Sequence, residues 1–261
     1  MKPCFTHTLF VALAIVSISS GNAATRRSRL ADSQETTGQK AATFNRLVTK
    51  TFSGNYLVHI PKLPKGERKA KYPLILFLHG SGERGTDLSL VKKHGPPSFL
   101  DEQTTFPFIV VSPQCPLKQW WDEPTLMALL DDVEKKYPVD LDRVYLTGIS
   151  MGGFATWELA TKHPERFAAI IPICGAGNPY LAENLKTVPI WAFHGAKDQA
   201  VPVSATEVMV PAVKKAGGDA QQTIYPDATH NSWTRTYANP EIYEWLLQHT
   251  KKPGPPLSIE D

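Results

Sequence analysis

A serine between glycines is the clearest sign of chemistry in the chain. Ser150 lies in Gly-Ile-Ser-Met-Gly, residues 148–152, which fits the pattern G-x-S-x-G. An apolar segment precedes this run and an amphipathic segment follows it, which predicts a strand, a tight turn and a helix. The positive end of that helix would favour an oxyanion beside Ser150. We expect Ser150 to be a nucleophile; the alternative is a serine that only caps the helix.

A serine hydroxyl becomes a good nucleophile only when a base takes its proton. His230 follows the last predicted strand, in a loop that the sheet would place opposite Ser150. Asp198 lies just beyond an earlier strand and is the expected acceptor that orients the imidazole. Asp227 is an alternative acid, but it shares a loop with His230 and lies only three residues away. The predicted order along the chain is therefore Ser, Asp, His.

Attack on a carbonyl carbon creates an oxyanion, which backbone N–H groups can stabilise. Met151, next to Ser150, supplies one such group. We assign the second to the N–H of Ser81, with Gly82 as the alternative. The run His-Gly-Ser-Gly at residues 79–82 follows an apolar segment and places small residues where the backbone must approach a substrate.

The same loop also matches the glycine pattern of dinucleotide-binding sites, G-x-G-x-x-G, at residues 80–85. Such a site requires a helix that begins in the loop and an acidic residue at the end of the next strand. Residues 86–97 end in two prolines, and the next predicted strand ends in Ser-Pro-Gln. We therefore expect no cofactor, and we assign no metal site.

The elements that must position these residues alternate along the chain. Alternating strands and helices predict an α/β fold with a mostly parallel sheet and helices on both faces. Ligands bind such sheets beyond the carboxyl ends of the strands, where the candidate residues gather. The expected strands are 56–60, which could pair with 46–52, then 73–78, 106–111, 143–147, 167–173, 188–193 and 221–225, and the expected helices are 125–137, 151–162, 203–216 and 240–249.

Composition is that of an ordinary globular protein of 261 residues, with 20% charged and 42% hydrophobic residues. The length suits one α/β domain. A net charge of +3, without a stripe of Lys and Arg, gives no reason to expect nucleic acid as a partner.

The two ends of the chain differ from its middle. Residues 1–24 combine Lys2, a short apolar stretch and small residues suited to cleavage, as in a secretory signal peptide. We expect a flexible leader at 25–43, a single α/β domain at 44–250, and a proline-rich disordered tail at 251–261. The mature protein would then be secreted or periplasmic, with no membrane association after cleavage.

Five runs occur in a set order: LHGSGERGTD at 78–87, SPQCP at 112–116, TGISMGG at 147–153, HGAKDQAVP at 194–202 and ATHNSW at 228–233. Together they resemble the phospholipase/carboxylesterase and dienelactone-hydrolase-like branch of the α/β-hydrolases, which includes secreted bacterial esterases related to the prolyl-oligopeptidase catalytic domain. The resemblance covers roughly residues 44–247. It implies an α/β-hydrolase fold and hydrolysis of carboxylic esters through an acyl-enzyme, without a cofactor. It places the triad on Ser150, Asp198 and His230 and the oxyanion hole on the backbone of Ser81 and Met151.

Two cysteines remain after the predicted signal peptide. In this fold, the strands before Cys115 and Cys174 are separated by two others, or roughly 14 Å at about 4.8 Å per step. A disulfide needs Cα atoms within about 7 Å of each other. We expect free, partly buried thiols.

The segment between the strands 167–173 and 188–193 is short and polar, so we expect a minimal lid or none and soluble esters as substrates. The candidate substrate-binding residues lie on loops near the site. Each tryptophan could stack on a sugar or aromatic group, or could only fill space between loop and sheet. Glu83 and its neighbour Arg84 could bind a polar group, or could only hold their loop. These candidates are Gly82, Glu83, Trp120, Trp121 and Trp233.

The leading hypothesis is a serine hydrolase of carboxylic esters, acting on small-molecule or oligosaccharide esters. A peptidase acting on short peptides is a close alternative in mechanism. A non-catalytic binding protein that keeps the fold is an alternative of another class.

Overall fold

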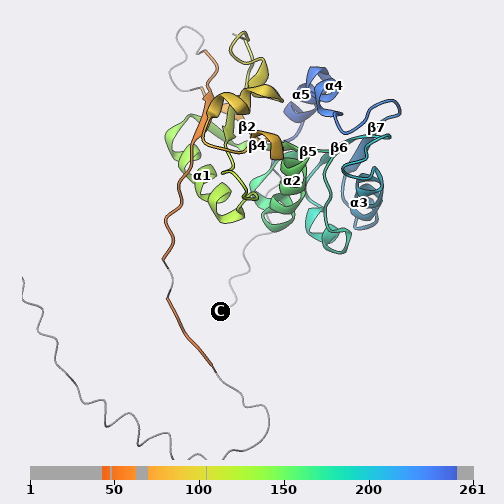
Figure 1. Cartoon of the computed structure of the whole chain (residues 1–261), viewed down its shortest axis with the longest axis horizontal. Helices are drawn as coiled ribbons and strands as arrows, with labels where there is room; N and C mark the ends of the chain where they lie inside the picture. The colour runs from red at the N-terminus through yellow and green to blue at the C-terminus, as the bar shows by residue number, and fades with distance from the viewer. Residues whose placement is uncertain (1–42, 48, 63–69, 104, 252–261) are drawn as a thin grey trace, which may run out of the picture. The chain divides into compact units, whose positions relative to one another are not determined.

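The computed structural model describes residues 43–47, 49–62, 70–103 and 105–251 (Figure 1). The predicted signal peptide, almost all of the leader, and all but the first residue of the predicted tail lie outside this range. The chain divides into two units, residues 1–49 and 50–261. In the first unit, the described residues contain neither helix nor strand. The second unit holds all the elements discussed below.

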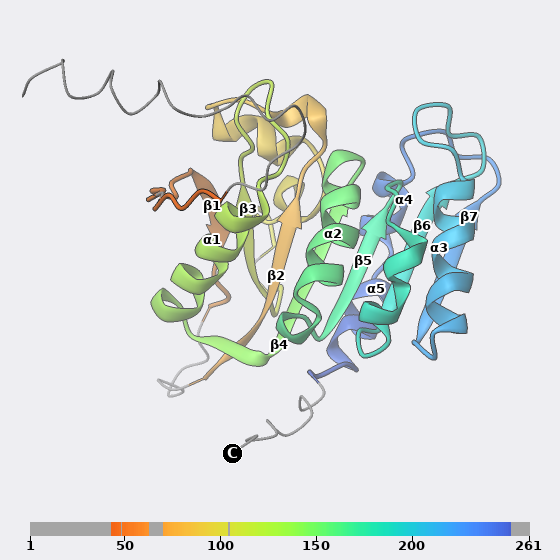
Figure 2. The same ribbon diagram turned by 90° about the horizontal axis from the view of Figure 1, so that it is seen from below.

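A sheet of seven strands forms the centre of the second unit, in the order β1-β3-β2-β4-β5-β6-β7 (Figure 2). Only β1 is antiparallel to its neighbour, so the predicted mostly parallel sheet is confirmed. The central strands are continuous apolar runs because helices cover both of their faces. The strands are β1 (Tyr56–His59), β2 (Tyr72–Leu78), β3 (Ile109–Pro113), β4 (Val139–Ile149), β5 (Ala169–Ile173), β6 (Ile190–Gly195) and β7 (Ala220–Tyr225).

Helices lie on both sides of the sheet, as Figure 2 shows. One face packs against α1 (Glu123–Lys136), α2 (Met151–Lys162) and α3 (Ser204–Lys215). The other face packs against α4 (Trp233–Ala238) and α5 (Glu241–Leu247). Short 3-10 helices, labelled η, occupy several loops: η1 (Ser81–Glu83), η2 (Leu88–Lys93), η3 (Pro96–Ser98), η4 (Pro164–Arg166) and η5 (Pro179–Leu185).

Two expectations about the elements are corrected. The described residues of 46–52 form no strand, and β1 pairs with β3 instead. Phe52 is 41% exposed, so this segment buries little of the apolar surface that a further strand would need. Helix α4 was not predicted, because six residues are too few to show a helical period.

The segment from β5 to β6 contains η5, which packs against α2 and α3. Ala182 and Leu185 of η5 join the apolar core formed with α2 and α3. This described segment therefore holds no lid, in agreement with its polar sequence. Among the described residues, no helix is long and apolar enough to cross a membrane.

Candidate active site

Ser150 lies in a tight turn between β4 and α2. Its dihedrals, φ 51° and ψ −116°, fall in a region that side-chain-bearing residues rarely adopt. A Cβ at Gly148 would collide with the carbonyl of Gly152, and one at Gly152 would collide with the carbonyl of Leu78. The glycines are therefore required because β2, β4 and α2 approach closely here. Such strain persists where the surroundings enforce it, and it is common at functional sites.

Three side chains from distant parts of the sequence meet beside this turn. The Oγ of Ser150 lies 2.9 Å from Nε2 of His230. The Nδ1 of His230 lies 2.7 Å from Oδ2 of Asp198. The structure thus brings together the three residues singled out in the sequence. Asp227, the alternative acid, instead pairs with Arg235 at the surface.

The carboxylate of Asp198 is enclosed and well supplied with donors. Its side chain is 0% exposed, and Oδ1 accepts the N–H groups of Ala200 at 2.8 Å and Val201 at 2.9 Å. Burial alone would raise the pKa of this carboxyl, but the hydrogen bonds from His230 and the two backbone groups outweigh burial and lower the pKa below its ordinary value. Asp198 therefore stays ionised and can stabilise a positive charge on His230.

A second histidine supports Asp198 and was not singled out in the sequence. The Nε2 of His194 lies 3.2 Å from Oδ2 of Asp198 and 3.0 Å from the carbonyl of Val201. Because a carbonyl oxygen only accepts hydrogen bonds, this nitrogen carries the hydrogen. The Nδ1 of His194 lies 2.8 Å from the hydroxyl of Thr206, so that hydroxyl donates to it. The four-residue spacing between His194 and Asp198 was the signal available in the sequence.

The loop after β2 is held against Ser150 by His79. The N–H of Cys115 donates to Nε2 of His79 at 3.0 Å, so Nδ1 carries the hydrogen and donates to the carbonyl of Gly80 at 2.6 Å. Burial lowers the pKa of His79, which keeps the ring neutral. A Cβ at Gly80 would lie 3.6 Å from the Cβ of Ser150. The loop that carries Ser81 and Gly82 is therefore next to the serine.

Both backbone groups assigned to the oxyanion hole are unengaged. Among the described residues, no backbone carbonyl accepts a hydrogen bond from the N–H of Ser81 or Met151. Gly82 has open space beside its Cα, since a Cβ there would meet nothing within 4 Å. Free N–H groups next to a nucleophile can stabilise an oxyanion.

The three candidate tryptophans differ in environment. Trp120 is 53% exposed and meets the ring of Phe154 edge-on, with 6.0 Å between ring centres. Trp121 is buried, and its Nε1 donates to the carbonyl of His79 at 3.2 Å, which fits the structural alternative. Trp233 is half-buried, with its ring 5.4 Å from that of His230.

One cluster near the site has donor atoms of the kinds that bind metals. Atoms of Cys174, Asp198 and His230 lie within 4.8 Å of one another. Burial raises the pKa of the Cys174 thiol to about 12, so the sulfur keeps its proton. Since Asp198 and His230 already bind each other, this geometry suits proton transfer better than metal binding.

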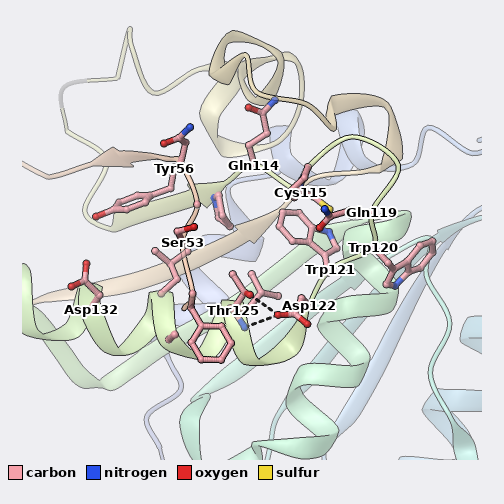
Figure 3. A pocket seen from close by; sticks show the side chains of 18 residues that line it. Ser53, Tyr56, Gln114, Cys115, Gln119, Trp120, Trp121, Asp122, Thr125 and Asp132 are labelled. Atoms are coloured by element: carbon pink, nitrogen blue, oxygen red, sulfur yellow. Dashed lines mark hydrogen bonds between the residues drawn. The ribbon is translucent and has the colours of Figure 1, made fainter. Parts of the chain in front are cut away.

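A separate cavity of about 340 Å³ lies beside α1 (Figure 3). Its walls come from residues 52–56, the loop after β3, and α1. Trp121 lines the cavity and also contacts His79, so it stands between the cavity and the loop beside Ser150. The cavity is not lined by Ser150, Asp198 or His230. It is therefore distinct from the reaction centre.

Comparison with known proteins agrees with this geometry. The sequence model of the dienelactone hydrolase family matches residues 118–243. A solved thermostable esterase is 36% identical with a TM-score of 0.68, and the match covers 75% of this chain and 59% of that one. The chain has the α/β-hydrolase fold and is similar in sequence to the dienelactone hydrolase family over residues 118–243. The predicted fold is thereby confirmed, as is the resemblance to this family.

Curated relatives of this α/β-hydrolase include esterases and peptidases. The bifunctional acetylxylan esterase/xylanase XynS20E of Neocallimastix patriciarum is 26% identical over 140 residues, which cover 51% of this chain and 20% of that protein. Dipeptidyl-peptidase 5 of Porphyromonas gingivalis is 25% identical over 265 residues, which cover 79% of this chain and 38% of that protein. The chain thus spans less than half the length of either relative. These relationships support hydrolysis, and esterase activity broadly.

Proposed function

We propose that this hydrolase cleaves carboxylic esters of soluble substrates through an acyl-enzyme formed on Ser150. One observation carries the proposal: an unbroken hydrogen-bonded chain from Ser150 Oγ through His230 to the ionised Asp198. A serine, a base and an orienting acid in this arrangement are the requirements of nucleophilic acyl transfer.

The proposed reaction has two halves. In the first, Ser150 Oγ attacks the ester carbonyl carbon while His230 Nε2 takes the hydroxyl proton, and the oxyanion accepts hydrogen bonds from Ser81 and Met151. The tetrahedral intermediate then collapses, and His230 returns the proton to the departing alcohol. In the second half, His230 takes a proton from water, which attacks the acyl-enzyme. The acid product leaves and Ser150 regains its proton.

The preference for soluble esters rests on the surroundings of the site. The segment between β5 and β6 packs against α2 and α3, and the side chain of His230 remains 28% exposed. The relatives named as esterases support esters as the substrate class. We propose small-molecule or oligosaccharide esters, and the apolar segment within residues 1–24 supports a secreted or periplasmic location.

A peptidase acting on short peptides is a second candidate, because the alignment with dipeptidyl-peptidase 5 covers 79% of this chain. Parallel assays on p-nitrophenyl acetate and an aminoacyl anilide separate the two. We expect faster turnover of the acetate, and a clear preference for the anilide would favour the peptidase.

The decisive test is Ser150→Ala. We expect kcat on p-nitrophenyl acetate to fall by about 10³-fold or more, since the nucleophile is lost while the fold remains. A fluorophosphonate probe should label the wild-type enzyme and the control Ser89→Ala, but not Ser150→Ala. Absence of labelling in the wild type would instead favour a non-catalytic binding protein. A fall in melting temperature that parallels the loss of activity would indicate a structural serine.

A further inference from the structure

Glu83, in η1, is a nearly buried carboxylate without a hydrogen-bond partner among the described residues. The residue is 6% exposed, and its Oε1 lies 3.7 Å from Nε2 of His94. That separation is too long for a hydrogen bond. Buried carboxylates in proteins are nearly always satisfied, because an unpaired one is costly to desolvate. The carboxylate of Glu83 is therefore free to accept a hydrogen bond from a bound ligand.

The carboxylate of Glu83 lies near the reaction centre. A Cβ placed on Gly80 would lie 3.3 Å from Oε2 of Glu83 and 3.6 Å from Cβ of Ser150. Glu83 and the nucleophile thus flank the same point on the loop that carries the proposed oxyanion hole. The oxygens of Glu83 retain some exposure to solvent, so a ligand can reach them. The Oγ of Ser232, by contrast, is fully buried and has no hydrogen-bond partner among the described residues. A substrate at Ser150 would come within reach of this acceptor.

The rings of His94 and Trp233 form a row of contacts from Glu83 to His230. The ring of His94 lies 5.4 Å from that of Trp233, at an angle of 60°. The ring of Trp233 meets that of His230 edge-on, also at 5.4 Å. A carboxylate beside aromatic surfaces can bind a molecule that combines hydroxyl groups with an apolar face, such as a polyol or a sugar.

The charges around Glu83 favour a neutral donor over a cationic one. Arg84 is held on the same loop, where its Nε donates to the carbonyl of Ser81 at 2.9 Å. At His79 the two charges act in opposite directions, since Glu83 raises the pKa of that imidazole and Arg84 lowers it. Because the guanidinium offsets the carboxylate, the site offers an acceptor without a strong attraction for ammonium groups.

We propose that Glu83 accepts a hydrogen bond from a free hydroxyl group next to the scissile ester, so that the enzyme selects partially acylated polyols or sugars. This inference rests on the proposed function, since it assumes ester cleavage at Ser150. Glu83 is then a specificity-determining residue. A site built around a substrate hydroxyl rejects analogues that lack it, because its own polar group is left unpaired.

The test compares two esters that differ only in hydroxyl groups: glycerol monoacetate and the same ester with both free hydroxyls methylated. We expect wild-type kcat/KM to be higher for glycerol monoacetate. In Glu83→Met the ratio of the two kcat/KM values should fall by about 10-fold or more. Glu83→Gln keeps a weaker acceptor and should retain part of the ratio. The exposed Glu207 of α3 offers a control, and Glu207→Met should keep the wild-type ratio.

Two results would overturn the inference: no wild-type preference for glycerol monoacetate, or an unchanged ratio in Glu83→Met. An unchanged ratio with losses on both esters would mean that Glu83 only shapes the loop. Labelling by a fluorophosphonate reports the state of Ser150 independently in every variant. A wild type that is neither labelled nor active on either ester refutes the proposed function, whereas a labelled enzyme with an unchanged ratio refutes only the role of Glu83.

Discussion

Two nearly buried carboxylates, Asp198 and Glu83, lie near Ser150, and their surroundings differ. Asp198 receives two backbone N–H groups and contacts His230 and His194. Among the described residues, the carboxylate of Glu83 has no hydrogen-bond partner, and Nε2 of His94 lies 3.7 Å from it. A satisfied carboxylate belongs to the internal machinery of a site, whereas an unsatisfied one is available to a ligand. Under the proposed function, Asp198 therefore supports the chemistry at Ser150, and Glu83 selects the substrate.

The largest expected effect is on catalysis by Asp198→Asn. The amide keeps the shape of the side chain but removes the charge that orients and stabilises the imidazole of His230. We expect kcat to fall by about 10³- to 10⁴-fold. The loss should be equal for hydroxylated and methylated esters, in contrast to the selective loss in Glu83→Met. Steady-state kinetics on both esters provide the measurement, and a selective loss in Asp198→Asn would remove the distinction between the two carboxylates.

Unfolding experiments compare the same two residues without a substrate. Asp198→Ala leaves buried donors without an acceptor and should lower the free energy of unfolding by about 1–3 kcal/mol. Glu83→Gln removes a nearly buried charge that accepts no hydrogen bond from the described residues, so it should be neutral or stabilising. Urea titrations of both variants give these values. A marked loss of stability in Glu83→Gln would show that the carboxylate has a structural partner.

Acid should weaken the fold in two steps. Burial lowers the pKa of His79 below its ordinary value of 6.5, so below that pH the unfolded chain binds a proton that the folded protein does not. Stability from this residue is present above pH 6.5 and is lost as the pH falls. The pKa of Asp198 also lies below its ordinary value of 3.8, so its stabilisation is present above that pH and is lost as the pH falls through the folded-state pKa.

The first acid step is the smallest of the expected effects. The free energy of unfolding, measured between about pH 7 and about pH 5, should decline less steeply in His79→Asn than in the wild type. Parallel curves for the two proteins would mean that His79 does not link the stability of the loop to pH.

The sequence predicted those parts of the site that local pattern determines. Ser150 could be placed because an apolar strand, two glycines and a helix adjoin it, and α2 begins and ends at the predicted residues. The burial of Trp121 could not be predicted, because it depends on the loops after β2 and β3 meeting, and spacing along the chain does not encode that meeting. The support from His194 had a signal in its four-residue spacing from Asp198, but that spacing alone does not show that the two side chains meet.

The sequence also could not predict that the carboxylate of Glu83 has no hydrogen-bond partner among the described residues. Glu83 and Arg84 are neighbours and could have formed an ion pair, but the guanidinium binds the carbonyls of Ser81 and Gln119 instead. Whether a carboxylate finds a partner depends on how distant segments of the chain fold together. Sequence reasoning could therefore name Glu83 as a candidate but could not say which of its two roles applies.

The two thiols of the described chain have a consequence for where the protein can fold. Cys115 and Cys174 are free and buried, at the ends of strands that β2 and β4 keep apart. Within the described residues, the domain holds no covalent cross-link that an oxidoreductase would have to install or that glutathione could undo. Its covalent structure would be the same in a reducing and an oxidising compartment. Folding of this part of the chain after export would therefore require no disulfide formation.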